Sequence, residues 1–316
     1  MHRYSVFGGC LLSAIPFPEL RPSRDDAPDW TLQRAETPPE TGTPTAPLGE
    51  DWVDVNVRVR LFRRAGGFRL EYDDTGSFDV LQGGSRILWH PGSYARPQAV
   101  RLDVLGRVLP LALHVSGALC LHGSAVAIDG SGIAFLAPKL HGKSTLAQAM
   151  VAAGARMASD DVVPVYASAP PQMAPGVPSA RLLSDALEQL GNRLPSSASA
   201  GEKHTLDLLP DDRLMLGPVP LAAVYLLKPS QPAAAEDPAH RTQLPPLHAA
   251  LALLREAKLG ALLGESEAAI LLDRVAAIAR TVPVYTLELV RGWELLPRAV
   301  AQLLAWHQET PVPVEV

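Results

Sequence analysis

The feature that most constrains this chain is a short apolar strand that runs into a loop and then into a helix. The strand is expected at residues 133–136 and the helix at residues 143–153, with Gly154 as a C-terminal cap. The loop and the first helical turn comprise Ala137, Pro138, Lys139, Leu140, His141, Gly142, Lys143, Ser144 and Thr145. A strand, loop and helix in this order indicate an α/β protein.

This loop has the groups that bind a triphosphate. Its backbone N–H groups and the helix N-terminus can surround phosphate oxygens, Lys143 can reach between the β- and γ-phosphates, and the Ser144 hydroxyl can ligate Mg²⁺. Gly142 keeps the backbone open to the ligand. Two positions depart from the usual pattern, because Ala137 replaces the first glycine and Pro138 lacks an N–H donor. We predict that residues 137–145 bind ATP together with Mg²⁺.

A pair of aspartates follows the next strand, expected at residues 156–158. Phosphoryl transfer to a hydroxyl needs one carboxylate that accepts a proton and another that holds the metal, and Asp160 and Asp161 can divide these tasks. Consecutive aspartates are also typical of an exposed acidic turn, and a short Gly-Lys-Ser pattern can arise by chance. The order of strand, loop, helix, strand and acid favours the functional interpretation. His122 alone would be interpreted as structural.

The N-terminal third of the chain has a different pattern. Residues 52–61 alternate between apolar and polar side chains, which predicts one half-buried strand, and residues 68–72 alternate again after a glycine turn. Residues 21–50 are rich in proline and are expected to form a loop. We therefore predict an α/β protein with an N-terminal antiparallel β-rich subdomain at residues 1–98 and a P-loop catalytic domain at residues 99–316.

Further elements of the second domain follow from composition and periodicity. A helical pattern runs from residue 97 to residue 119 and precedes a strand at residues 124–128. The later expectations are a helix at 181–190, a strand at 222–227, helices at 247–263 and 265–279, a strand at 284–289 and a last helix at 293–307.

Composition excludes several classes of protein. The chain has 316 residues, 47% hydrophobic and 19% charged, with a net charge of −5, which describes a soluble globular protein without a nucleic-acid surface. Cys10 and Cys120 match no metal-ligand spacing and are expected to be reduced thiols in a cytoplasmic protein. No segment reaches the ~18 apolar residues of a membrane span. Residues 4–17 are apolar enough to resemble a secretory signal, but Pro16 and Pro18 interrupt the run, and residues 4–7 are interpreted as a first strand.

The segment from His122 to Asp161 resembles the bacterial HPr kinase/phosphorylase family. That family has a His-Gly before a strand, then a loop ending in Gly-Lys-Ser, then a tandem Asp, and the separations from His122 to Lys143 and from Lys143 to Asp160 match. The resemblance covers residues 121–165 and implies a serine kinase with a catalytic domain of HPr-kinase type. It implies that Lys143 and Ser144 hold phosphates and Mg²⁺, that Asp160 is the general base, that Asp161 assists the metal and that His122 contacts phosphate.

The chain departs from this family downstream. The Glu-x-Arg-Gly-x-Gly signature is not found, and the corresponding region is residues 175–182. Because that signature is linked with dephosphorylation of phosphoserine-HPr, the resemblance does not extend to phosphorylase activity or to HPr as the acceptor. The chain is more similar to divergent HPr-kinase-related proteins with a β-rich N-terminal region, some of which phosphorylate the C-terminal serine of lasso-peptide precursors. The family's tendency to assemble suggests a homo-oligomer.

Cations outside the loop are further candidates. Arg181, Lys203 and His204 can contact phosphate or the acceptor, because extra positive charge stabilises a transferring phosphoryl group. The alternative, which we favour, is that Arg181 starts an ordinary helix and Lys203 lies in a solvated loop. Trp293 and Trp306 have a spacing that suits core packing, and we assign them no chemistry.

The sequence thus predicts a kinase that uses ATP and Mg²⁺ to transfer the γ-phosphoryl group to a serine hydroxyl of a peptide or small protein. A kinase of a small hydroxylated metabolite and a nucleotide-sensing binding protein without turnover are the alternatives. No nucleic-acid or membrane partner is expected.

Overall fold

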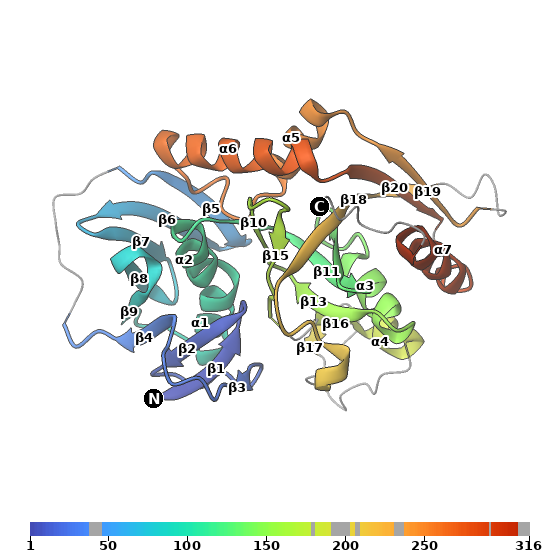
Figure 1. The fold of residues 1–316 in the computed structure, drawn as a ribbon. Coiled ribbons are helices and arrows are strands. Elements are labelled where there is room, and N and C mark those ends of the chain that lie inside the picture. Colours follow the sequence, from blue (N-terminus) through green and yellow to red (C-terminus); the bar gives the residue numbers. More distant parts are fainter. Residues whose placement is uncertain are drawn as a thin grey trace.

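The computed structural model describes residues 1–37, 46–177, 181–190, 203–205, 209–230, 237–290 and 292–308. Two large β-sheets stand side by side, and helices α5 (Pro246–Arg255) and α6 (Glu265–Thr281) lie across the top of both in Figure 1. One hydrophobic cluster contains Leu61 of the first sheet, Ala134 of the second and Val275 of α6. The two halves therefore share a core. No helix in these described ranges is long and apolar enough to cross a membrane.

The first sheet is formed by the N-terminal strands. Their spatial order is β3 (Arg21–Pro22), β1 (His2–Val6), β2 (Gly9–Ser13), β4 (Trp30–Arg34), β9 (Arg86–Pro91), β8 (Gly76–Leu81), β7 (Gly67–Tyr72), β6 (Val57–Arg64) and β5 (Gly49–Asp54). The expectation of an antiparallel sheet was incomplete, because β4 runs parallel to both β2 and β9. The connection at residues 14–29 is long enough for the chain to cross over and enter the sheet again in the same direction.

Two local predictions in this region were wrong. The alternation over residues 52–61 spans two strands, and Val55 at the turn between them is 84% exposed. A two-residue turn preserves the alternation of side chains, so periodicity did not reveal it. Residues 21–50, expected to be a loop, contain β3 and β4, because Trp30 and Leu32 are buried in the core. Residues 38–45 of that segment lie outside the described part of the chain.

A helical segment joins the two sheets. It comprises α1 (Pro97–Asp103), a π-helical turn at Val104–Val108 and α2 (Leu109–Val115), and its buried face packs in the core shared with the first sheet. The helix predicted to continue to residue 119 ends at Val115, and Gly117 adopts a left-handed φ of 111°. Glycine reaches this conformation without strain, so the chain can turn there into strand β10 (Ala118–Leu121).

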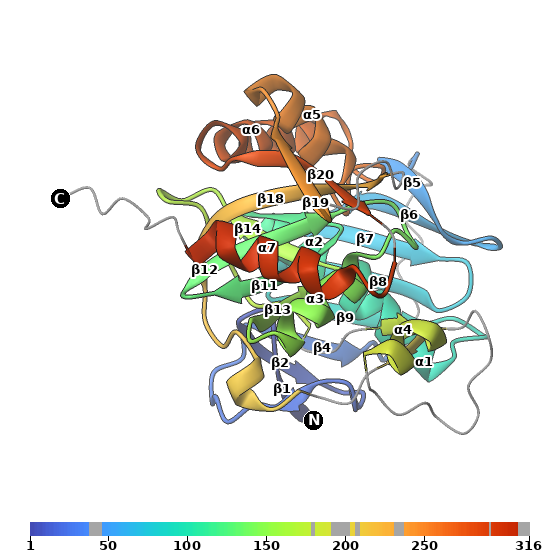
Figure 2. The same ribbon diagram turned by 90° about the vertical axis from the view of Figure 1, so that its right-hand side faces the viewer.

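The second sheet carries the loop. Its spatial order is β10, β14 (Val163–Tyr166), β15 (Gln172–Met173), β18 (Val219–Ser230), β12 (Ser131–Leu136), β11 (Gly123–Ile128) and β13 (Arg156–Asp160), while β20 (Val284–Val290) pairs with β18 and β19 (Ala239–Gln243) pairs with β20. Ile133 and Phe135 face α3 (Lys143–Ala152) and α7 (Leu296–Gln308), whereas Ala134 and Leu136 face the core shared with the first sheet. Figure 2 shows α3 and α7 together on one face.

The remaining elements differ from expectation at their ends. Residues 181–190 form a strand, β16 (Arg181–Leu183), which pairs with β17 (Lys203–Thr205), and then a helix, α4 (Ser184–Gln189). The helix predicted at 247–263 ends at Arg255, and the last helix begins at Leu296 rather than residue 293.

Candidate active site

The loop at residues 137–142 leaves the end of β12 and enters α3. Gly142 is the residue before the helix and has a left-handed φ of 85°, a conformation that strains residues with a Cβ. Leu140 also has a left-handed φ of 67° and is exposed. Pro138, Lys139 and His141 are exposed too, and His141 Nδ1 lies 2.9 Å from the Lys139 carbonyl oxygen. The loop is therefore a tightly bent backbone whose surface is open.

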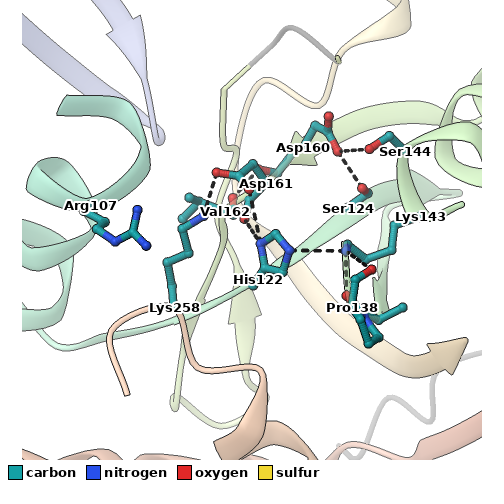
Figure 3. Close-up of polar contacts among 12 residues, drawn as sticks. Arg107, His122, Ser124, Pro138, Lys143, Ser144, Asp160, Asp161, Val162 and Lys258 are labelled. Atoms are coloured by element: carbon teal, nitrogen blue, oxygen red, sulfur yellow. Dashed lines mark hydrogen bonds and ion pairs between the residues drawn. The ribbon is translucent and has the colours of Figure 1, made fainter. Parts of the chain in front are cut away.

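The side chain of Lys143 folds back onto this loop. It is 7% exposed, and its Nζ donates to the carbonyl oxygens of Ala137 at 2.6 Å and Pro138 at 3.1 Å. The same Nζ lies 3.2 Å from His122 Nε2, and Figure 3 marks this contact with a dashed line. An ammonium can only donate hydrogen bonds, so Nε2 accepts and the proton of neutral His122 is on Nδ1. A buried cation thus joins the loop to the residue between β10 and β11.

Asp160 receives two hydroxyl groups at one carboxylate oxygen. Ser144 Oγ donates to Oδ1 at 2.8 Å, and Ser124 Oγ donates to the same atom at 2.6 Å. The pairing of β11 with β13 sets Ser124 opposite Asp160, while Ser144 comes from the first turn of α3. The sequence assigned no role to Ser124, although it lies two residues after His122.

The Ser144 and Asp160 side chains fit a magnesium ion. No group of three or more His, Cys, Asp or Glu side chains gathers anywhere in the described ranges. Mg²⁺ at nucleotide sites does not require such a group, because it is usually coordinated by one or two carboxylates together with phosphate oxygens and water. A hydroxyl at the start of α3 and a carboxylate oxygen 2.8 Å from it are a suitable donor set.

Asp161 faces different partners from its neighbour. Its Oδ2 accepts from Lys258 Nζ at 2.7 Å, and its Oδ1 lies 3.2 Å from His122 Nδ1. Desolvation by the surrounding groups would raise the pKa of this carboxyl, but the charge of Lys258 and the contact with His122 hold its pKa well below the usual value. Asp161 is therefore ionised at neutral pH. Its side chain is 53% exposed, whereas the whole of Asp160 is 8% exposed.

Lys258 is a site residue that the sequence did not reveal. It lies 97 residues from Asp161 and shares no motif with it. A single β-bridge between Leu121 and Ala257 brings it there, because Lys258 N donates to the Cys120 oxygen at 2.8 Å and His122 N donates to the Glu256 oxygen at 2.7 Å. His122 and Lys258 directly follow the two residues of this bridge, so the bridge brings both of them to the site.

The π-helical turn forms a further wall of the site. A Cβ added to Gly106 would lie 3.9 Å from Asp161 Oδ2. The next residue, Arg107, donates from Nη2 to Asp51 Oδ2 at 2.7 Å, and Figure 3 shows it on the side of Asp161 and Lys258. The helical segment that joins the two sheets thus approaches Asp161 through this turn.

The other predicted cations lie on the small β16–β17 ribbon. Leu182 pairs with His204 and Leu183 pairs with Lys203 in that ribbon. His204 Nε2 lies 3.2 Å from Ser184 Oγ, while the side chains of Arg181 and Lys203 lie outside the described structure. A role for these three residues stays a prediction.

Comparison with known proteins adds one distant likeness. No protein-family model and no curated protein matches the chain. Among solved structures, the chain is similar to the Hpr(Ser) kinase/phosphatase from Coxiella burnetii, with a TM-score of 0.32 and 14% identity over 60% of this chain and 95% of that chain. This likeness is too distant to transfer the role of any residue, so the family named from residues 121–165 stays a prediction.

Proposed function

We propose that this chain is a kinase that uses ATP and Mg²⁺ to phosphorylate a serine hydroxyl in a peptide or small protein. The observation that carries the proposal is that two consecutive carboxylates have different partners. Asp160 accepts from Ser144 of the phosphate-binding loop, whereas Asp161 pairs with Lys258 and with His122. This arrangement supports a division of roles, in which one carboxylate coordinates the metal and the other accepts the proton of the acceptor hydroxyl.

In this proposal Asp161, rather than Asp160, is the general base. The resemblance to HPr kinases implied the opposite assignment, and neither has been tested. The 2.8 Å hydrogen bond from Ser144 supports a metal-holding role for Asp160, because a loop serine at this position is the residue that ligates Mg²⁺. The greater exposure of the Asp161 side chain, at 53%, supports its contact with an incoming acceptor.

The transfer step assigns a task to each side chain. The acceptor oxygen bonds to the γ-phosphorus, Asp161 takes the hydroxyl proton, and the bond from the γ-phosphorus to the bridging oxygen breaks to release ADP. The low pKa of Asp161 is compatible with this task, because a loose transition state needs little activation of the nucleophile. Lys143 exchanges the Ala137 and Pro138 carbonyls for phosphate oxygens, and His122 stays beside it. Mg²⁺, when bound, neutralises charge on the phosphate oxygens.

The acceptor class is inferred from the resemblance in residues 121–165. A peptide with a C-terminal serine, as in lasso-peptide precursors, is the first acceptor to test.

The test is a transfer assay with γ-labelled ATP, Mg²⁺ and three sets of acceptors: peptides that end in serine, HPr, and small hydroxylated metabolites. Label on a peptide seryl oxygen, located by phosphopeptide mapping and lost in Lys143→Ala, supports the proposal. Label only on metabolites would identify a small-molecule kinase instead. Nucleotide binding without transfer to any set would contradict the proposal and favour the binding protein.

A further inference from the structure

A cavity of about 380 Å³ opens beside the phosphate-binding loop. Gly142, Lys143, Ser144 and Thr145 line one end of it. The remaining wall is mostly apolar and includes Leu183 next to α4, Leu227 of β18, Leu289 of β20 and Trp293 before α7. A phosphate held on the loop would therefore have apolar space on one side.

The cavity lies where three parallel strands end. β12 runs parallel to β18, and β18 runs parallel to β20, so their carboxyl ends share one edge of the sheet. The loop follows β12, and the ends of β18 and β20 supply Leu227, Leu289 and Val290. In open α/β sheets this edge is where nucleotide ligands bind.

The groups proposed to react lie outside this cavity. Among the residues that the structure describes, neither His122, Asp161 nor Lys258 lines the cavity. Consider a nucleoside triphosphate whose terminal phosphate faces these groups and whose other phosphates lie on the loop. The end of this molecule that carries no phosphate then extends into the cavity. The cavity thus suits the part of the donor that does not react, and not the acceptor.

We propose that this cavity binds the base and ribose of the nucleotide, with the indole of Trp293 stacked on the base. The inference rests on the proposed use of a nucleoside triphosphate. Trp293 is 36% exposed, which leaves ring surface free at the cavity wall. The turn around it is fixed, because Leu295 N and Leu296 N both donate to the Gly292 oxygen at 3.2 Å. The sequence had assigned Trp293 to core packing.

The test compares ATP with inorganic tripolyphosphate, which has the phosphates but no base. Calorimetric titrations in Mg²⁺ use the wild-type protein, Trp293→Ala, Trp293→Phe and a control, Trp52→Ala, whose exposed indole lies on β5 away from the cavity. Loss of base stacking is expected to weaken ATP binding about tenfold in Trp293→Ala. Tripolyphosphate binding is expected to stay within about twofold in every variant, because it requires only the loop.

The conservative variant separates stacking from folding. Trp293→Phe keeps an aromatic face and is expected to retain ATP affinity within about threefold, while Trp52→Ala matches the wild type. Trp293→Ala that binds ATP as tightly as the wild type would overturn the inference. If the wild-type protein binds tripolyphosphate as tightly as ATP, the cavity holds no base, although the phosphate site stands. If the wild type binds neither ligand, both the inference and the proposed function fail.

Discussion

Ser144 Oγ donates a hydrogen bond of 2.8 Å to Asp160 Oδ1 and so joins the first turn of α3 to the end of β13, 16 residues further along the chain. Lys143 and Asp161 are the immediate neighbours of these two residues. This contact helps to hold the loop at residues 137–142 close to the acidic pair. The two carboxylates diverge because β13 ends at Asp160 and Asp161 has a left-handed φ of 70°.

Replacement of each aspartate by asparagine is expected to have a different effect on the transfer reaction. Asp160→Asn should raise the Mg²⁺ concentration needed for half-maximal transfer, because a metal-holding charge is lost. Asp161→Asn should lower kcat by roughly 10²- to 10⁴-fold without changing the Mg²⁺ requirement, because the proton acceptor is lost. Initial rates measured over a Mg²⁺ titration at saturating ATP check both.

The affinity for ADP shows whether these two variants are correctly folded. Both are expected to bind ADP without metal within about threefold of the wild type, whereas Lys143→Ala should lose both binding and transfer. A normal kcat in Asp161→Asn would return the base role to Asp160.

Lys258 is expected to set the acidic limb of the pH–rate profile. Asp161 accepts a proton only when ionised, which requires a pH above its pKa, and Lys258 lowers that pKa. Lys258→Met removes this charge, which is the largest influence that lowers the pKa of Asp161, so activity should be lost at a higher pH than in the wild type. Measurement of kcat/KM from pH 3 to 7 checks the shift, because Lys258 places the wild-type limb below the usual carboxyl range. Lys258→Arg keeps the charge and should leave the limb near its original position, and an unmoved limb in Lys258→Met would argue against this role.

The sequence predicted the centre of the second sheet because its signals are local. A buried strand, a loop with Gly142 and a helix are neighbours in the chain, and their geometry follows from short-range sterics and hydrogen bonds. His122, Lys143, Asp160 and Asp161, singled out by spacing, lie together in the structure. Their chemical roles stay predictions.

The sequence could not predict contacts that depend on long-range pairing. Lys258 reaches Asp161 through a bridge between Leu121 and Ala257, and no local pattern encodes such a bridge. Alternation likewise indicates which side chains of a strand are buried but not its partner. It therefore missed the turn at Val55 and the parallel placement of β4.

Asp103 is expected to make stability depend on pH. It is 6% exposed, its Oδ2 accepts from Thr75 Oγ1 at 2.6 Å, and burial raises its pKa to about 7. Because an unfolded carboxyl has a pKa near 4, the stability from the protonated form is full below about pH 4 and is lost as pH rises through about 7. Asp103→Asn mimics the neutral form. Relative to the wild type it should gain stability between pH 4 and 8, by at most about 4 kcal/mol.

Urea denaturation at pH 4.5 and pH 8 checks this difference for Asp103→Asn. Asp129→Asn is the matched control, because Asp129 is an exposed acid in the turn between β11 and β12. The control should show no gain with pH. An equal effect of the two substitutions at pH 8 would contradict the assignment to burial.

Arg274 is expected to hold α6 against the end of α2 and the start of β10. Its Nη1 donates to the carbonyl oxygens of His114 at 2.8 Å and Ala118 at 2.9 Å, and lies 3.2 Å from His114 Nδ1. Burial, with the charge of Arg274, lowers the pKa of His114 to about 4, so the ring is neutral above that pH and Nδ1 can accept. Arg274→Ala leaves these acceptors without this donor, which should cost about 3 kcal/mol and lower Tm by several degrees. Arg280→Ala, at the exposed end of α6, should change Tm little in the same thermal scan, and an equal change in both variants would show that the contact with His114 and Ala118 is not what holds α6.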